Sequence, residues 1–144
     1  MKSNRSDRVF DAIHDLMHLY RSRQYRVLRD GPYDLTHMEF KVLSFFTRRP
    51  GSTQSDLVQH TGRDKAQIAR LIQALRNRGL LDAQADPLDK RFQRLHPTEA
   101  GLAMQQAIEE EGRVVSRQAI HDLSAQECDT LVALLERIQH NLDS

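Results

Sequence analysis

Residues 63–97, with the sequence RDKAQIARLIQALRNRGLLDAQADPLDKRFQRLHP, are the part of the chain that decides its fold. The first half repeats apolar residues at helical spacing and ends at Gly79, a residue that often terminates helices. The second half holds two short, partly alternating segments on either side of a polar turn at residues 86–91. The stretch therefore predicts a helix followed directly by an antiparallel β-hairpin. The apolar helix positions are Ile68, Leu71, Ile72 and Leu75, and the strand segments are residues 80–85 and 92–96.

A short helix is expected immediately before this stretch. Thr53 is its expected capping residue, the helix covers residues 54–60, and Gly62 closes the segment. Asp64, with Gln67 three residues later, is the expected cap of the helix that follows. A short helix, a tight turn containing glycine and a longer helix form the pattern of a helix-turn-helix.

Four further helices are expected around this motif, each with apolar residues at helical spacing. Two of them begin at capping boxes, Thr36 with Glu39 and Ser124 with Glu127. The complete order is helix, helix, short helix, helix, hairpin, long helix, helix, which predicts a mainly α protein with one small antiparallel hairpin. The four helices cover residues 8–29, 36–48, 98–120 and 124–142, and the apolar positions of the long one are Leu102, Ala103, Ile108, Val115 and Ala119.

The composition is typical of a folded, helix-rich protein of the cytoplasm. A length of 144 residues fits one domain, and a hydrophobic content of 39% argues against disorder. The apolar stretches are too short for a membrane span, and the polar start from Met1 to Asp7 is unlike a signal peptide. Cys128 is the one cysteine, which excludes an intrachain disulfide framework and zinc-finger spacing.

The charge is distributed unevenly although the net charge is +1. Residues 63–97 carry eight Lys or Arg and four Asp or Glu, whereas residues 98–144 carry three and nine. A basic middle segment beside an acidic C-terminal segment fits contact with nucleic acid. A salt-bridged surface with accidental asymmetry explains the charges equally well.

The second helix of the helix-turn-helix motif is the candidate DNA-reading element, because its N-terminal residues enter the major groove in proteins of this type. If Ile68, Ile72 and Leu75 face the core, helical spacing turns a polar face outward. Gln binds an adenine edge, Arg and Lys bind guanine or phosphate, and small alanines allow close approach of the backbone. An ordinary solvated helix face is the alternative. The outward residues are Lys65, Ala66, Gln67, Ala69 and Arg70.

The hairpin turn carries Lys90 and Arg91 directly after Asp89. Arg is favoured in a narrow minor groove because of the enhanced negative potential there. Asp89 is out of place beside DNA unless it orients Arg91 through a bidentate pair. A hairpin with a basic tip after a recognition helix is typical of a wing, and the predicted fold is therefore a winged helix-turn-helix.

Motifs along nearly the whole chain resemble the MarR (multiple antibiotic resistance regulator) family. The strongest is the run of residues 86–91 followed by Leu95 and by Thr98-Glu99-Ala100-Gly101. Upstream, residues 63–72 and the run Arg78-Gly79-Leu80-Leu81 also look like that family. Further similar positions are Leu35-Thr36, Val42-Leu43, Gln54-Ser55-Asp56-Leu57 and Leu75.

The resemblance implies a single MarR-like domain over residues 1–144. Residues 8–29 and 98–144 are then dimerisation helices, which cover the apolar stripes of the terminal segments in a homodimer, and residues 35–97 form the winged helix-turn-helix lobe. It also implies palindromic double-stranded DNA operators and, often, release by small anionic or phenolic ligands or by oxidation. We expect Thr53 and Gln54, at the start of the short helix, to contact DNA as well.

Two positions depart from the family pattern. Asp82 stands after Leu81, where the family often has a basic residue, so one phosphate contact is in doubt. Ala69 stands where Ser or Thr is common, so a hydroxyl contact is missing. Both departures leave the expected fold unchanged and bear on operator affinity and sequence.

An effector pocket is expected, from the resemblance, between the dimer helices and the DNA-binding lobe. The candidate lining residues for a small aromatic or anionic ligand are Tyr20, Phe45 and Phe46 with Arg21 or Arg23. A place in the hydrophobic core is the more ordinary role for the three aromatic residues.

Two other features suggest sensing roles. His14 and His18 lie four residues apart on the first helix, a spacing that can contribute to a metal site. Surface or interface histidines are the alternative, since no HExxH pattern or cysteine accompanies them. Cys128 stands in the apolar stripe of the last helix, where a buried cysteine behaves as a small hydrophobic residue and redox sensing is the less ordinary role.

The leading hypothesis is a DNA-binding transcriptional regulator, a homodimer acting as a ligand-relieved repressor. Phosphate-binding loops and nucleophile motifs are absent from the sequence, and the run Glu109-Glu110-Glu111 is typical of a solvated face. We therefore expect no enzyme activity, no cofactor, no metal and no membrane partner. A winged-helix module that binds another protein, or a metal-responsive regulator using His14 and His18, are the alternative hypotheses.

Overall fold

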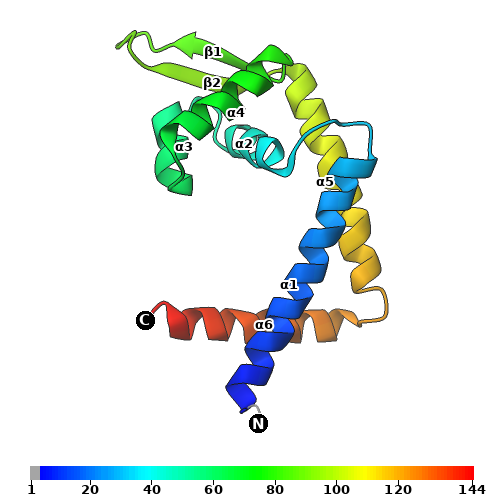
Figure 1. The fold of residues 1–144 in the computed structure, drawn as a ribbon. Coiled ribbons are helices and arrows are strands. Elements are labelled where there is room, and N and C mark those ends of the chain that lie inside the picture. The colour runs from blue at the N-terminus through cyan, green and yellow to red at the C-terminus, as the bar shows by residue number, and fades with distance from the viewer. Residues whose placement is uncertain (1–3) are drawn as a thin grey trace. The chain divides into compact units, whose positions relative to one another are not determined.

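The computed structural model describes residues 4–144 and has the predicted order of helices around one hairpin (Figure 1). The mainly α winged helix-turn-helix architecture is thereby confirmed. Residues 1–3, which open the predicted domain and the polar N-terminal stretch, lie outside the described residues. The elements are α1 (Arg5–Asp30), α2 (His37–Arg48), α3 (Gln54–Thr61), α4 (Lys65–Asn77), β1 (Leu81–Ala85), β2 (Gln93–Pro97), α5 (Glu99–Ala119) and α6 (Ala125–Leu142).

Local capping groups set most helix boundaries. The side chains of Thr36, Thr53 and Ser124 each accept a hydrogen bond from the backbone N–H three residues later, and their own backbone N–H groups donate to the carboxylate of that later residue, so three complete capping boxes form. Helix α1 begins three residues earlier than predicted because the Asn4 side chain accepts a hydrogen bond from the backbone of Asp7. The side-chain oxygens of these N-cap residues, which accept hydrogen bonds from the first turn, thus explain where the helices start.

Both ends of α4 lie where the sequence predicts, but the capping hydrogen bond expected at its start does not form. Gly79 has φ +73°, and the Leu80 and Gly79 N–H groups donate to the Leu75 and Arg76 carbonyls, which is a Schellman motif. At the other end, Asp64 occupies the N-cap position, but its side chain makes no capping hydrogen bond. The predicted Asp64 cap is therefore wrong. Asp64 has φ −58° and ψ 131°, outside the extended conformation that the capping residues Thr36, Thr53 and Ser124 adopt.

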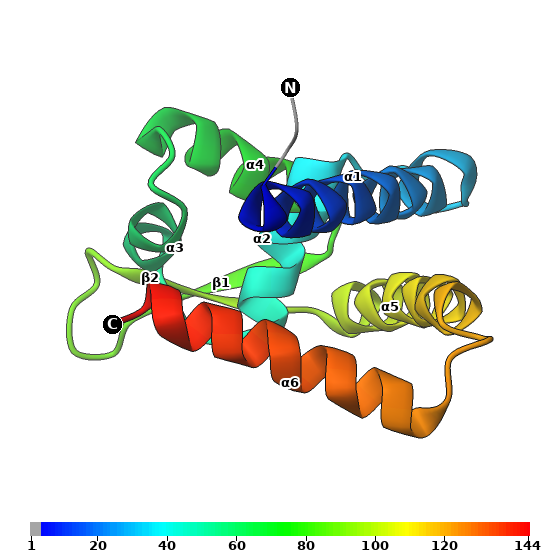
Figure 2. The ribbon, with the colours of Figure 1, turned by 90° about the horizontal axis from the view of Figure 1, so that it is seen from below.

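A single hydrophobic core joins α2, α3, α4 and the hairpin into one lobe (Figure 1 and Figure 2). Leu43, Phe46, Ile68 and Leu75 are fully buried there, in agreement with the predicted helical spacing. The end of α1 and the turn after it reach the same core. Their buried residues are Leu28, Tyr33 and Leu35.

The two strands pair antiparallel in a register that places Leu81 opposite Pro97 and Ala85 opposite Gln93. Residues 86–92 connect them and project from the lobe (Figure 1). Phe92, predicted to open the second strand, lies in this connection and is 47% exposed.

The described chain divides into two compact units, which meet within α5 between Glu111 and Gly112. In the first unit α5 buries Gly101, Gln105 and Ile108, residues that share one helical face. Leu102 and Ala103, two of the apolar positions expected in this helix, are exposed. The second unit contains the end of α5 and all of α6. The single-domain organisation over residues 1–144 stays a prediction.

Apolar residues of α1 and α6 remain uncovered in the isolated chain. On α1, Leu16 and Leu19 are 58% and 66% exposed, and α6 has no buried residue at all. Within residues 4–144, no helix combines the length and the apolar character that crossing a membrane requires.

Candidate nucleic-acid interface

The outward face of α4 is the first part of the candidate interface. Ile68, Ile72 and Leu75 are buried against the core, as the spacing predicted. Lys65, Ala66 and Arg70 consequently lie exposed, and Gln67 and Ala69 are half-buried on the flanks of the same helix. The face offers two cations and one amide to a ligand, with small side chains between them.

The start of α3 contributes Thr53 and Gln54, both half-buried. The hydroxyl of Thr53 accepts the Asp56 N–H at 3.2 Å, and the Asp56 carboxylate accepts the Thr53 N–H at 2.9 Å. Since the Thr53 hydroxyl is already used as an acceptor, it retains its own hydrogen for donation to an anion.

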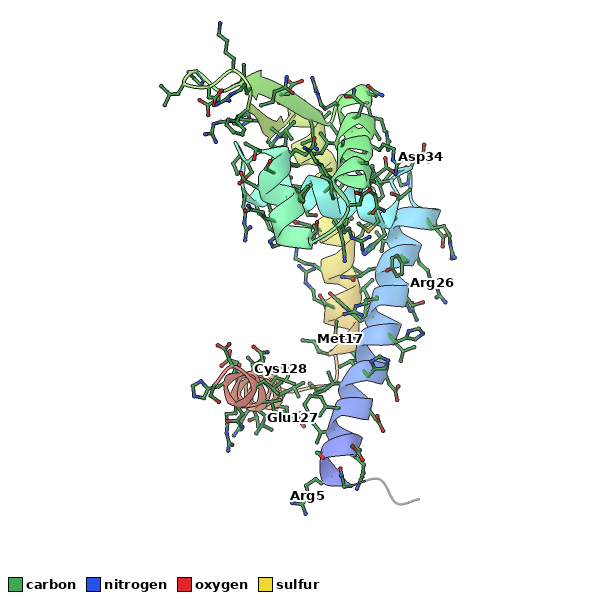
Figure 3. The ribbon with its side chains drawn as sticks, turned by 60° about the vertical axis from the view of Figure 1, so that its left-hand side comes forward. Arg5, Met17, Arg26, Asp34, Glu127 and Cys128 are labelled. Carbon is green, nitrogen blue, oxygen red and sulfur yellow. The ribbon has the colours of Figure 1, made fainter. Side chains whose placement is uncertain are left out.

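The wing tip holds the expected bidentate pair. Arg91 donates from Nε to Asp89 Oδ1 at 3.0 Å and from Nη2 to Asp89 Oδ2 at 2.8 Å, and its backbone N–H also donates to Oδ1 at 3.1 Å. The Arg91 guanidinium, followed by its backbone N–H, lowers the pKa of Asp89, so the carboxylate stays charged. Lys90 beside them is exposed to solvent, and in Figure 3 the side chains of this connection stand clear of the helices.

A second acid–base pair, which the sequence analysis missed, lies at the base of the wing. Arg94 donates from Nε and Nη2 to Asp86 Oδ2 at 3.1 and 2.8 Å, while Asp86 Oδ1 accepts the Leu88 N–H at 2.8 Å. The Leu88 N–H, followed by the Arg94 guanidinium, lowers the pKa of Asp86. The strand register could have predicted this pair, because it makes Asp86 and Arg94 diagonal neighbours across the hairpin.

The wing base is also attached to the loop between α2 and α3. Arg94 Nη1 donates to the Gly51 carbonyl at 2.9 Å. Ser52 and Leu95 form an isolated β-bridge, in which the Leu95 N–H donates to the Ser52 carbonyl and the Gly51 N–H to the Leu95 carbonyl, each at 2.9 Å. Gly51 has φ +87°, which a residue without Cβ adopts freely. Thr53, the cap of α3, follows directly, so the wing base and the start of α3 form one connected piece.

The residues considered for an effector pocket lie in two places. Phe45 and Phe46 are buried in the hydrophobic core, with their rings in an edge-on contact at 5.1 Å. Tyr20 is half-buried and Arg21 exposed on α1. The core position is the ordinary role weighed for these aromatic residues, and the effector role stays a prediction.

The structure also locates the residues considered for sensing. His14 and His18 are exposed on α1, and Cys128, labelled in Figure 3, is half-buried near the start of α6. Among residues 4–144, no three His, Cys, Asp or Glu side chains gather closely enough to hold a metal ion.

Known proteins share both sequence and fold with the chain. A model of the MarR family matches residues 33–91. The transcriptional regulator HosA of Escherichia coli is 27% identical over 129 residues, which are 90% of this chain and 95% of HosA. The reduced form of MarR from Escherichia coli is 26% identical with a TM-score of 0.69, over 87% of this chain and 94% of that one. FabT of Streptococcus pneumoniae, solved in complex with DNA, has a TM-score of 0.82 at 15% identity, over 96% and 97% of the two chains.

Proposed function

From the match of residues 33–91 to the MarR family, a family of winged helix-turn-helix, DNA-binding transcriptional regulators, and from the similarity to HosA and MarR, we propose that the chain represses transcription as a homodimer on a palindromic operator. A small aromatic or anionic effector relieves the repression. The observation that carries the proposal is the pairing of an outward polar face on α4 with a basic wing tip on the same lobe.

The two parts of the lobe suit the two grooves of B-form DNA. Gln67 and Arg70 of α4 are the base-reading residues, since Gln pairs with adenine and Arg with guanine in the major groove. Lys65 and the start of α3, at Thr53 and Gln54, contact phosphates, which position the protein without reading sequence. Arg91 enters the adjacent minor groove with Lys90 beside it.

Asp89 has an orienting role in this proposal. A carboxylate next to phosphates is repelled, but the two parallel hydrogen bonds to Arg91 neutralise it and hold the guanidinium plane. Ala66 and Ala69 let the α4 backbone approach the bases.

The homodimer is supported by the uncovered apolar residues of α1 and α6. Covering a large apolar side chain stabilises the folded protein by about 1.5–3 kcal/mol, and a second copy is the partner that the family implies. Two recognition helices related by a two-fold axis then read half-sites about one helical turn apart, roughly 34–36 Å.

Fluorescence anisotropy with duplex DNA tests the proposal. The duplex is recovered from fragments of the organism's own genome by selection on the purified protein, and a shuffled duplex of equal composition is the control. We expect affinity for the selected duplex to fall steeply with rising salt, because phosphate neutralisation releases counterions. Absent binding, or affinity that is insensitive to salt, contradicts the proposal and favours a protein-binding winged helix.

A further inference from the structure

The wing projects from the lobe as a two-stranded ribbon, and something must hold its direction. A two-stranded hairpin on its own is at best marginally stable in water. Beyond Asp86 the ribbon has little support from the lobe: Leu88 is 97% exposed, and Lys90 and Arg91 are exposed as well. The aim of Arg91 therefore depends on the contacts at the wing base.

We propose that Asp86 and Arg94 are positioning residues, which fix the wing at the angle where Arg91 meets the minor groove. The inference rests on the proposed function, since it assigns the DNA-binding geometry of that same surface. Arg94, although basic and close to the DNA-binding residues, then acts through the wing and not as a phosphate contact.

The hydrogen bonds of Arg94 support this role. Three of its N–H groups are directed to protein oxygens, two to Asp86 Oδ2 and one to the Gly51 carbonyl. A planar guanidinium bound on two sides links the ribbon to the α2–α3 loop with a fixed geometry, which an ammonium on a flexible stem does not reproduce. A phosphate contact would have to compete with these bonds.

The surroundings of Asp86 support it equally. This carboxylate is 9% exposed, and both its oxygens accept hydrogen bonds, one from the turn at Leu88 and one from Arg94. A negative charge close to a phosphate-binding surface weakens DNA binding by itself. The presence of this charge is explained if Asp86 holds the start of the wing tip, at Leu88, to Arg94 in β2.

The connection extends from the wing to the major-groove elements. The Gly51 carbonyl that accepts from Arg94 lies two residues before Thr53, and the bridge from Ser52 to Leu95 continues the same contact. Because Thr53 caps α3, the brace defined by Asp86, Arg94 and Gly51 sets the wing relative to the helix-turn-helix.

The decisive variant is Asp86→Asn, matched by Asp82→Asn on the same hairpin. The Asp82 side chain is exposed and makes no hydrogen bond or ion pair with the described residues 4–144. Each substitution removes one negative charge, so simple electrostatics predicts unchanged or tighter binding for both. The brace predicts a loss of about tenfold for Asp86→Asn, the order expected when one charged DNA contact fails, and no loss for Asp82→Asn.

A second pair of variants keeps the test valid if Asp86→Asn folds poorly. Arg94→Lys preserves the charge and loses the planar fork, so we expect it to weaken binding as much as Arg94→Ala does. In an Arg91→Ala background both should have little further effect, because the residue they position is gone. Hydroxyl-radical footprinting of the Arg94 variants tests the same point. We expect the DNA to lose its protection at the minor-groove positions and to keep its protection where α4 binds.

Binding is measured by anisotropy on the selected duplex, with the active fraction determined by stoichiometric titration. If Arg94→Lys binds like the wild type, or if its effect adds fully to that of Arg91→Ala, the brace is wrong. Equal affinities of Asp86→Asn and Asp82→Asn overturn it too. If wild-type protein binds no duplex in a salt-dependent manner, the proposed function fails and this inference fails with it.

Discussion

The Tyr33 hydroxyl donates a 2.8 Å hydrogen bond to Glu111 Oε1, so the turn after α1 is tied to α5 across 78 residues of sequence. The same turn accepts hydrogen bonds from Arg78, at the end of α4, to the carbonyls of Tyr33 and Asp34. One short turn therefore contacts α5 on one side and the end of α4 on the other.

Tyr33→Phe removes this hydrogen bond and leaves the ring in the core. We expect a loss of about 1 kcal/mol in the free energy of unfolding, the usual net contribution of a part-buried hydrogen bond. Urea denaturation followed by circular dichroism measures it. An unchanged midpoint would show that water replaces Tyr33 at Glu111 without penalty.

The stability that Tyr33 contributes should vanish in alkali. The hydrogen bond to Glu111, followed by burial, raises the pKa of Tyr33 above 10.0. Because the folded state favours the neutral phenol, its contribution is complete below pH 10 and is lost as the pH rises through the raised pKa. The difference in unfolding free energy between wild type and Tyr33→Phe should therefore shrink above pH 10. A difference that persists well above that pH contradicts the assignment.

Gly101→Ala should destabilise the protein, although alanine favours helices. A Cβ at Gly101 would meet the carbonyl oxygen of Leu80 and lie 3.1 Å from its carbonyl carbon, so backbone must move. We expect a loss of about 1–3 kcal/mol, the usual range for overpacking. Gly112→Ala in the same helix meets nothing within 4 Å and is the control, with an expected gain of about 0.5–1 kcal/mol. Equal melting temperatures for the two variants would refute the close approach.

His37 should make the fold sensitive to mild acid. Its ring packs edge-on against Tyr25 at 4.4 Å, and burial, followed by the charges of Lys41 and Arg21, lowers its pKa below 6.5. Since the folded state disfavours the protonated ring, this stability is present above pH 6.5 and is lost as the pH falls through the lowered pKa. His37→Gln should flatten the thermal stability profile between neutral pH and pH 5, while His14→Gln on the exposed face of α1 should not. Identical profiles for all three proteins would rule out the effect.

Gln67→Ala and Arg91→Ala should weaken DNA binding in different ways. Loss of a bidentate adenine contact at Gln67 should cost about 1–3 kcal/mol at particular base pairs and leave other sequences unaffected. Loss of Arg91 should weaken binding broadly and make the salt dependence shallower. Anisotropy against a panel of single-base operator variants separates the two patterns. If Gln67→Ala lowers the affinity equally for every duplex, Gln67 does not read a base.

Leu16→Glu should dissociate the proposed dimer. Leu16 lies in the uncovered stripe of α1, where a buried carboxylate without a partner is strongly unfavourable. Leu88→Glu, on the exposed wing tip, is the matched control and should leave the oligomeric state unchanged. Sedimentation equilibrium gives the mass of each. A dimeric Leu16→Glu protein would move the interface away from α1.

Features that depend on neighbouring residues were predictable from the sequence, and features that depend on distant ones were not. The boxes at Thr36, Thr53 and Ser124 follow from side chains within one turn of the helix. Asp64 fits the same pattern of residue types, yet its carboxylate makes no capping bond, because residue type does not fix the conformation on which a cap depends. The link from Tyr33 to Glu111 needs the tertiary fold before either residue has a partner.

The candidate interface divides in the same way. Helical spacing sufficed to place Lys65 and Arg70 outward, because the period of α4 fixes which face is buried. Arg94 belongs to an otherwise ordinary strand, and its attachment to Gly51 spans 43 residues, so the periodicity of the strand contains no trace of it. Gln105 is buried at 1% exposure with a hydrogen bond to Ser44, a core position that a hydrophobicity pattern assigns to solvent.

The wing base and the wing tip are under different constraints as the sequence evolves. Asp86 and Arg94 are bound to each other, and Arg94 is bound to the α2–α3 loop, so a change at either disturbs a shared structure. The tip residues bond among themselves, as Arg91 does with Asp89, and Leu88 is left almost wholly in solvent. A duplicated copy of the gene can therefore vary the residues between Asp86 and Arg94 while the supporting lobe is inherited unchanged.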